Sequence, residues 1–345
     1  MEKIRLMVVD DSLLFRELVA KGYEKDDCIE VVGFAADPFE AKDRIPKLAP
    51  QVLLLDVEMP RMDGIKFLRN LMPQYPLPVI VISSLAVSVF EALDAGALDF
   101  IAKPASVADQ PAFLRELKDK VLAASTARFA FRRRVPDAIE LSAEGVAGAV
   151  DASRLIAIGA STGGTDAITS ILTKYSANMP GIVVAQHMPS GFTKMFAQRL
   201  DAACHLTVRE ARDGDAVEPG TALIAPGGLQ MEVVREGTPG AGGCYRVRCR
   251  ESAPVNGHRP AVDVLFGSVA EAAGPRAIGV LLTGMGVDGA AGLKRILDAG
   301  GRTIGQDERS SVVYGMPMAA WVMGAVQVQL PLFRIADEIL RMAQG

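Results

Sequence analysis

The sequence predicts an α/β protein that consists of two doubly wound parallel-sheet domains. Its length of 345 residues suggests two domains, because a domain usually has about 150 residues. Short apolar runs rich in β-branched residues alternate with helical segments, which is typical of parallel sheets covered by helices on both faces. Between residues 123 and 151 a run of small residues, several arginines and a proline breaks this pattern. We therefore predict one domain at 1–122, an interdomain linker at 123–151 and a second domain at 152–345.

Composition and charge exclude several classes of protein. Half of the residues are hydrophobic and 23% are charged, which is enough apolar material for one core per domain. The net charge of −4 gives no overall attraction to nucleic acid or to an anionic membrane, and no apolar run reaches the roughly 20 residues that span a bilayer. The four cysteines show no paired spacing, which favours a reducing compartment. We expect a cytoplasmic monomer with no nucleic-acid partner and no direct membrane insertion.

Apolar runs mark the expected strands. In the first domain they cover residues 5–9, 29–33, 52–55, 79–82 and 99–102, and in the second domain residues 155–158, 181–185 and 278–282. Stretches long enough for crossover helices separate the strands of the first domain, and each of the three runs in the second domain precedes a helical stretch. In such a sheet the carboxyl ends of the strands share one edge, which is where ligands bind.

Charged side chains gather at these strand ends in the first domain. Asp10 and Asp11 follow the first strand, and Asp56 ends the third. Three carboxylates at one edge repel each other unless a divalent cation neutralises them, and oxygen ligands of this kind suit Mg²⁺. Ser83 and Lys103 add a hydroxyl and an ammonium group at the ends of the fourth and fifth strands. The set predicts a site that holds a phosphoryl group.

The motifs VDDS at residues 9–12, LDVEMP at 55–60, MDG at 62–64 and AKP at 102–104 closely resemble those of two-component receiver domains. The resemblance covers residues 1–122 and implies a flavodoxin-like fold, with a chemotaxis histidine kinase as the phosphodonor for Asp56. It also assigns the Mg²⁺ ligands Asp10, Asp11, Asp56 and the backbone carbonyl of Glu58, the phosphoryl contacts Ser83 and Lys103, and the aromatic switch Phe100. Only 20 positions separate Ser83 from Lys103, so we expect a shortened fourth helix or preceding loop.

A glycine-rich turn follows the strand at residues 155–158. Residues 159–164 have the sequence GASTGG, which can be interpreted in two ways. As G-x-S-x-G, the turn would present Ser161 as a nucleophile. As G-x-G-x-x-G with Ser161 in place of the middle glycine, it would bind a dinucleotide, although Gln186 and His187 close the next strand where such a site needs an acid. Both place free amides at a helix N-terminus, which suits an oxyanion. A plain glycine-rich connection is about as frequent.

Three histidines are candidates for a base that would activate this serine. His187 follows the strand at 181–185 and so belongs to the same edge as Ser161. His258 lies in a polar loop and is the second choice, whereas the apolar neighbours of His205 indicate a structural role. Asp288 follows the strand at 278–282 and either orients the base or caps the helix expected at 290–297. The order serine, histidine, aspartate differs from that of the α/β-hydrolase fold.

Residues 159–165, 186–192, 258–266, 283–290 and 314–317 strongly resemble the chemotaxis methylesterases, over about 152–342. With the receiver in front, the whole chain resembles the response-regulator family of protein-glutamate methylesterases. The resemblance implies a Rossmann-like domain with Ser161 as nucleophile, His187 as general base and acid, and Asp288 as its orienting partner. It implies further that the backbone amides of Thr162 and Met285 form the oxyanion hole, and that the esterase reaction uses no cofactor.

The family resemblance also implies the substrates. They are methyl-accepting chemoreceptors, on which the enzyme would hydrolyse glutamate methyl esters to release methanol and deamidate certain glutamines, for chemotactic adaptation. In this family the receiver covers the Ser161 edge until Asp56 is phosphorylated. Two alternatives remain: a nicotinamide-dependent oxidoreductase that would bind pyrophosphate at residues 159–164, and a phosphorylation-controlled binding module without chemistry. A DNA-binding response regulator is disfavoured by the α/β pattern of the second domain.

Overall fold

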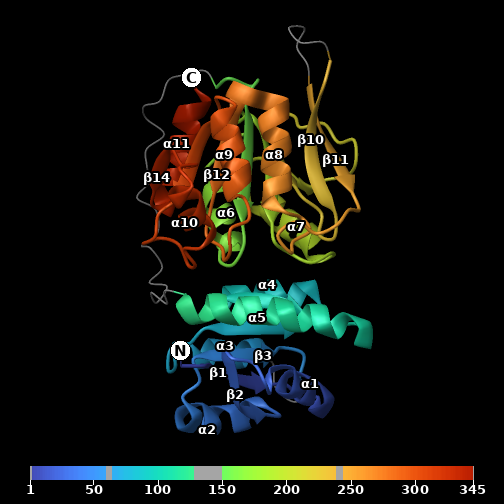
Figure 1. Ribbon diagram of the computed structural model, residues 1–345, viewed down its shortest axis with the longest axis vertical. Coiled ribbons are helices and arrows are strands. Elements are labelled where there is room, and N and C mark those ends of the chain that lie inside the picture. Colours follow the sequence, from blue (N-terminus) through green and yellow to red (C-terminus); the bar gives the residue numbers. More distant parts are fainter. Residues whose placement is uncertain (1, 60–63, 128–149, 238–243, 345) are drawn as a thin grey trace. The chain divides into compact units, whose positions relative to one another are not determined.

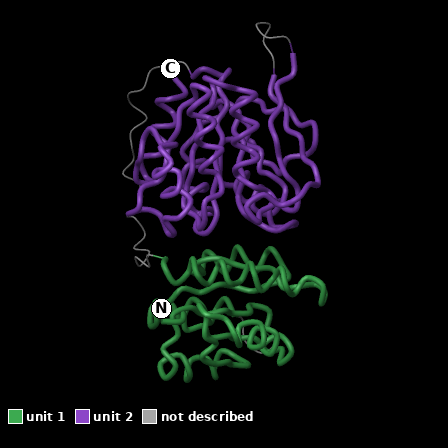
Figure 2. The backbone as a smooth tube through the Cα atoms, viewed as in Figure 1, with its two compact units in different colours: residues 1–136 green, residues 137–345 purple. Residues whose placement is uncertain are grey.

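The structure is a computed structural model, and it describes residues 2–59, 64–127, 150–237 and 244–344. The chain forms two compact units, at residues 1–136 and 137–345 (Figure 2). Most of the expected linker, at 128–149, lies outside the described residues. Its first residues are helical instead, because α5 (Gln110–Thr126) continues through Ala123 and Ala124, each 1% exposed. Of the small residues that suggested a linker in the sequence, Ala123 and Ala124 are buried in the first unit, whereas Ser125 and Thr126 are exposed.

The first unit is a five-stranded parallel sheet with the strand order β2-β1-β3-β4-β5 (Figure 1). This is the order of flavodoxin-like folds, as predicted. The elements before α5 are β1 (Ile4–Val9), α1 (Leu13–Tyr23), β2 (Ile29–Ala35), α2 (Pro38–Leu48), β3 (Val52–Asp56), α3 (Gly64–Leu71), β4 (Val79–Ser83), α4 (Ala86–Asp94), β5 (Asp99–Ala102) and a 3-10 turn (Val107–Asp109).

Both faces of the first sheet are buried. On one face Leu6 of β1 belongs to the same cluster as Phe15 of α1 and Leu117 of α5. Met7, which points to the opposite face, is also completely buried. Strands covered on both faces need apolar residues at almost every position, and this is why all five could be predicted from mostly apolar runs, although the edge strand β2 carries the exposed Glu30.

The second unit contains a seven-stranded parallel sheet with the order β14-β13-β12-β6-β7-β9-β8. From β6 the chain adds β7 on one side and later β12 to β14 on the other, so the sheet is doubly wound and its switch point lies between β6 and β12. The predicted fold class is confirmed for both domains. The elements are β6 (Leu155–Ala160), α6 (Gly164–Leu172), β7 (Gly181–Gln186), α7 (Phe192–Ala203), β8 (Thr207–Glu210), β9 (Thr221–Ile224), β10 (Gln230–Glu236), β11 (Cys244–Arg250), α8 (Val262–Ala273), a 3-10 turn (Gly274–Arg276), β12 (Ala277–Leu281), α9 (Ala290–Asp298), β13 (Arg302–Gln306), α10 (Met316–Val322), β14 (Val328–Leu330) and α11 (Leu332–Ala343).

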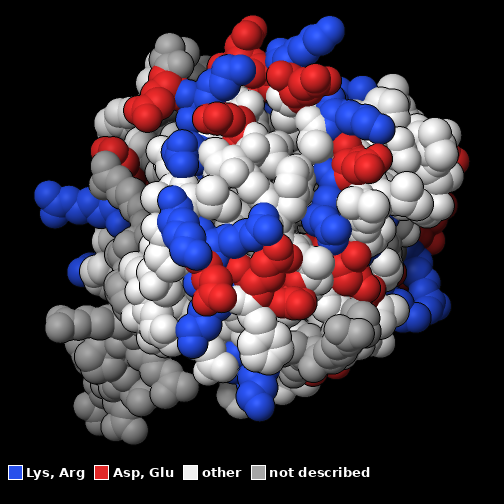
Figure 3. Space-filling view, turned by 90° about the horizontal axis from the view of Figure 1, so that it is seen from below, with Lys and Arg blue, Asp and Glu red and all other residues white. Residues whose placement is uncertain are grey.

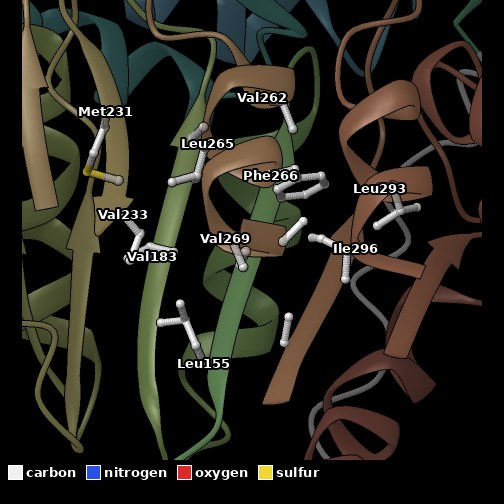
Figure 4. Packing of buried hydrophobic residues seen from close by; sticks show 14 of the residues in the cluster. Leu155, Val183, Met231, Val233, Val262, Leu265, Phe266, Val269, Leu293 and Ile296 are labelled. Atoms are coloured by element: carbon white, nitrogen blue, oxygen red, sulfur yellow. The ribbon is translucent and has the colours of Figure 1, made fainter. Parts of the chain in front are cut away.

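The second unit also contains an antiparallel hairpin of β10 and β11, which the sequence did not predict. Charged residues interrupt both strands, so neither forms a long apolar run. The inner face of the hairpin nevertheless packs into the core. Met231 and Val233 of β10 lie in one cluster with Val183 of β7 and Leu265 of α8 (Figure 4). This contact fixes the hairpin to the sheet and so positions the loop that follows β11.

Among the described residues, no helix is both long and apolar enough to cross a bilayer. On the face of the molecule in Figure 3, Lys and Arg side chains lie next to Asp and Glu side chains. Interspersed charges of both signs produce a weaker long-range field than a patch of one sign.

Candidate active site and phosphorylation site

Ser161 lies at the turn between β6 and α6, next to the switch point of the second sheet. Its backbone amide donates a hydrogen bond to the carbonyl of Thr283 at 3.0 Å, and its carbonyl accepts one from the amide of Gly164 at 2.7 Å. Gly163 has a φ of +78°, which glycine adopts without steric cost. The predicted sharp turn is therefore present, and the bond to Thr283 ties it to the loop after β12.

The loop after β12 approaches Ser161 most closely at Gly284. A Cβ atom at this position would lie only 2.7 Å from Cβ of Ser161, so glycine is required for the approach. Met285, one of the two residues expected at the oxyanion hole, follows directly in this loop. Thr162, the other, is 5% exposed, and its carbonyl accepts a hydrogen bond from the Thr283 hydroxyl at 3.0 Å. The two turns that carry the expected oxyanion amides are thus bonded to each other.

His187 directly follows β7 and lies next to the Ser161 turn. Ala160 and Gln186 are register partners at the ends of β6 and β7, and the amide of His187 donates to the carbonyl of Ala160 at 3.1 Å. Nε2 of His187 lies 2.7 Å from Oδ2 of Asp288, and the two side chains are only 7% and 1% exposed. Nδ1 is buried and has no hydrogen-bond partner among the residues that the structure describes. Because Nε2 faces the carboxylate, Nδ1 is the ring nitrogen left to take up a proton.

The Asp288 carboxylate is held by several donors besides His187. Oδ2 accepts a hydrogen bond from the amide of Val262 at 2.7 Å, and Oδ1 accepts one from Nδ2 of Asn256 at 2.9 Å. Burial by itself would raise the pKa of Asp288, but the hydrogen bond and charge of His187, together with these donors, lower it to about 2. Gly289, not Asp288, is the N-cap residue of α9. The carboxylate is therefore committed to His187 and not to capping the helix.

The other two histidines have different places. The ring of His258 is stacked on that of His187, with 3.6 Å between the ring centroids and 12° between the planes. The second choice for the base is thus a neighbour of the first. His205 is exposed, so the structural role expected from its apolar neighbours is wrong. Those neighbours, Cys204 and Leu206, follow the end of α7 and leave the imidazole on the surface.

Sequence reasoning assigned no role to Gln186 and Asn256. Gln186 is 4% exposed, and its Nε2 donates to the carbonyl of Ser161 at 3.0 Å and to that of His187 at 3.3 Å. It therefore joins the serine turn to the histidine. Asn256 lies in the loop after β11 and donates to Asp288. The one available signal was position in the sequence. Gln186 is a polar residue at the end of an apolar strand, and Asn256 lies two residues before His258, in the sequence Asn-Gly-His.

The first unit brings its predicted acidic residues together at the switch point between β1 and β3. Carboxylate oxygens of Asp10, Asp11 and Asp56 lie within 4.8 Å of one another. Nζ of Lys103 lies 2.6 Å from Oδ2 of Asp56 and 3.1 Å from Oδ2 of Asp10. Asp10 and Asp56 are completely buried, whereas Asp11 is exposed. Three converging carboxylates with one open side are a donor set that fits Mg²⁺, which keeps part of its water shell.

The charges of this acidic site depend on one another. Burial and the neighbouring Asp56 carboxylate raise the pKa of Asp10 to about 6, against the opposing charge of Lys103. Burial opposes the charge of Lys103 as well, but its hydrogen bond to Asp56 and the charge of Asp10 raise the pKa of this ammonium group. Lys103 thus stays charged and partly offsets the repulsion between the two buried carboxylates.

Ser83 contacts Glu58 in this structure. Its hydroxyl donates to Oε1 of Glu58 at 2.6 Å, and the same oxygen accepts bonds from the amides of Ser84 and Leu85 at 3.1 and 3.0 Å. The segment between Ser83 and Lys103 contains a fourth helix of nine residues, α4. Phe100 is 4% exposed, so the expected switch residue points into the unit.

Comparison with known proteins agrees with this arrangement. A family model described as CheB methylesterase matches residues 156–339, and one described as response regulator receiver domain matches residues 6–115. The chain belongs to the CheB methylesterase family. The receiver match lies in the first unit and the CheB methylesterase match in the second.

Relatives of this CheB family align over almost the whole chain. A Syntrophomonas wolfei protein named protein-glutamate methylesterase/protein-glutamine glutaminase 2 is 51% identical over 344 residues, which cover 99% of this chain and 98% of the relative. A Pseudomonas aeruginosa protein of the same name is 48% identical over 346 residues, with 99% and 97% covered. The solved CheB methylesterase catalytic domain of Thermotoga maritima is 37% identical, has a TM-score of 0.52, and covers 55% of this chain and 98% of that domain.

Proposed function

We propose that this chain is a phosphorylation-activated protein-glutamate methylesterase, which hydrolyses glutamate methyl esters on methyl-accepting chemoreceptors and deamidates receptor glutamines for chemotactic adaptation. The observation that carries the proposal is the buried pair of His187 and Asp288 beside the Ser161 turn. Relatives that are about half identical over nearly the whole chain carry both activities in their names. The four cysteines are all free, which supports a cytoplasmic location.

The proposed reaction starts at Ser161. Its hydroxyl oxygen attacks the carbonyl carbon of the ester while Nδ1 of His187 takes up the hydroxyl proton. Asp288 orients the ring and stabilises the imidazolium. The backbone amides of Thr162 and Met285 donate to the oxyanion. His187 then returns the proton to the departing methanol, and water hydrolyses the acyl-enzyme with the same groups. A glutamine side chain would react in the same way, with ammonia as the leaving group.

The proposed switch is phosphorylation of Asp56 by a chemotaxis histidine kinase. When bound, Mg²⁺ would neutralise phosphoryl oxygens during the transfer. Its proposed ligands are Asp10, Asp11, Asp56 and the Glu58 carbonyl. Lys103 already reaches Oδ2 of Asp56 and is placed to contact the phosphoryl group. Ser83 would exchange its bond to the Glu58 carboxylate for one to a phosphoryl oxygen.

The proposal is tested by methanol release from membranes that contain methylated chemoreceptors. The full-length chain is assayed with Mg²⁺, with and without acetyl phosphate, beside the variant Asp56→Asn. We expect acetyl phosphate to raise the rate of the parent and to leave that of the variant unchanged. Equal rates in all four assays would contradict the switch. A complete lack of methanol would instead favour a binding module without chemistry.

A further inference from the structure

Asn256 joins two carboxylates beside the candidate active site. Its Nδ2 atom lies 2.9 Å from Oδ1 of Asp288 and 2.8 Å from Oδ2 of Asp263. A side-chain amide nitrogen carries two hydrogens and can donate one to each carboxylate. His187 contacts the other oxygen of Asp288, Oδ2. Asn256 therefore holds the orienting carboxylate at the oxygen that the histidine does not use, where the backbone amide of Asp263 also donates at 3.1 Å.

The two carboxylates are fixed in place. Oδ2 of Asp288 accepts a hydrogen bond from the amide of Val262 at 2.7 Å, and Oδ1 of Asp263 accepts one from the amide of Gly292 at 2.7 Å. Burial, together with the charge of Asp288, raises the pKa of Asp263. Like charges that cannot move apart repel each other, and the Asn256 amide is the donor that they share. Its removal would leave Asp288 facing Asp263 without this shared donor.

Asn256 and Gly257 are the central residues of a tight turn. Val255 and His258 exchange backbone hydrogen bonds of 3.1 and 2.9 Å, and φ is +52° at Asn256 and +82° at Gly257. Positive φ at both central residues is the property of a type I′ turn, for which Asn-Gly, Asp-Gly and Gly-Gly are all favoured. His258, directly after the turn, stacks on His187. One turn therefore contacts both members of the His187–Asp288 pair.

We propose that Asn256 is a positioning residue of the esterase: its amide holds the Asp288 carboxylate in the orientation that keeps Nδ1 of His187 available to Ser161. The turn alone does not require asparagine, since glycine and aspartate fit the same backbone. What they lack is the donor to Asp288. This inference rests on the triad proposed above.

The test uses full-length variants whose backbone suits the turn. We would measure kcat, KM and the melting temperature of Asn256→Gly, Asn256→Asp, Asp263→Asn and the double variant Asn256→Gly/Asp263→Asn, on methylated receptor with acetyl phosphate and Mg²⁺. Asn178→Gly, at an exposed position between α6 and β7, is the matched control. The kcat of Asn256→Gly should fall about tenfold or more, the size of effect that is common when a residue that supports a functional side chain from behind is lost. KM and melting temperature should stay near the parent values.

Charge relief separates positioning from a merely structural role. Asn256→Asp adds a third carboxylate and should have a lower kcat than Asn256→Gly. In the Asp263→Asn background the loss caused by Asn256→Gly should shrink, because the repelling charge is gone. A kcat of Asn256→Gly within twofold of the parent, or an equal loss in both backgrounds, would overturn the proposal. Ser161→Ala is measured alongside: activity in that variant refutes the triad, whereas an inactive Ser161→Ala with a parent-like Asn256→Gly refutes only the role of Asn256.

Discussion

Nε2 of His187 lies 2.7 Å from Oδ2 of Asp288, and Nδ1 of the same buried ring has no hydrogen-bond partner among the described residues. A neutral imidazole carries one hydrogen, so the carboxylate fixes it on Nε2 and leaves Nδ1 as the acceptor. The ring is held between the end of β7 and the loop after β12, and His258 covers its face. Nδ1 is therefore the nitrogen that would take the hydroxyl proton of Ser161 in the proposed reaction.

Replacing His187 tests this role directly. The variant His187→Gln keeps a side-chain donor but loses the proton shuttle, so methanol release should fall by about 10² to 10⁴, the usual contribution of positioned acid–base catalysis. The exposed His205 offers the matched control. If His187→Gln retains a rate similar to that of His205→Gln, the base has been assigned to the wrong residue.

Gly284 sets the distance between the oxyanion loop and the serine. In Gly284→Ala the new Cβ would lie 2.7 Å from Cβ of Ser161 and would overlap the sulfur of Met316, so the two turns must separate. A displacement of about 1 Å at the reacting atoms can cost about 10²-fold in rate. We expect a loss of that size in kcat for methanol release.

Gly279→Ala is the control for Gly284→Ala. Gly279 lies on β12, the strand before the Gly284 loop. Its new Cβ would lie 2.7 Å from Cδ1 of Leu293 and 2.8 Å from Cδ1 of Ile296, which are flexible side-chain ends. It should lower the free energy of unfolding by about 1–3 kcal/mol but leave kcat nearly unchanged. A kcat for Gly284→Ala as high as that of Gly279→Ala would contradict the contact between the turns.

The pKa of Asp10 predicts a pH dependence of the first unit. Its folded-state pKa of about 6 lies above the ordinary 3.8, so the folded unit binds the proton more tightly than the unfolded chain. The stabilisation is complete below about pH 4 and is lost as the pH rises through 6, at a cost of about 3 kcal/mol. Asp10→Asn should therefore raise the melting temperature of the first unit at pH 7.5 and have little effect at pH 4.5. Calorimetry of the full chain measures the melting temperature of the first unit at both pH values. An equal shift at pH 7.5 and pH 4.5 would contradict a raised pKa of Asp10 as the cause.

The pKa of Asp10 also predicts how Mg²⁺ binding depends on pH. Because the ion needs the ionised form of Asp10, its affinity should rise as the pH increases to about 6 and level off above this value. Titration calorimetry with Mg²⁺ alone measures this, and Asp10→Asn should abolish the pH dependence together with most of the affinity. An affinity that is constant between pH 5 and pH 7.5 would place the ion away from Asp10.

Much of the fold and of the candidate site could be predicted because both depend on strand ends. Asp56, Ser161 and His187 each stand at or directly after the end of an apolar strand, and a parallel sheet brings such positions to one edge. The hairpin of β10 and β11 was missed because Glu232 and Arg246 break up its apolar pattern, although its inner face is buried.

Other features depend on tertiary contacts that a sequence pattern does not contain. Asn256 meets Asp288 only because the turn after β11 folds onto the loop after β12. Ser83 was expected to face a phosphoryl group on Asp56, and its present partner Glu58 follows from the path of the loop after β3. Ala123 suggested a linker by composition, whereas its burial on α5 depends on packing.

The most direct measurement is methanol release from methylated chemoreceptor by Ser161→Ala, together with phosphorylation of Asp56 in the same preparation. Alanine removes only the hydroxyl oxygen that is proposed to attack the ester. We predict no methanol above the uncatalysed background, while Asp56 is phosphorylated to the same extent as in the parent. Methanol release by Ser161→Ala at a substantial fraction of the parent rate would contradict the account.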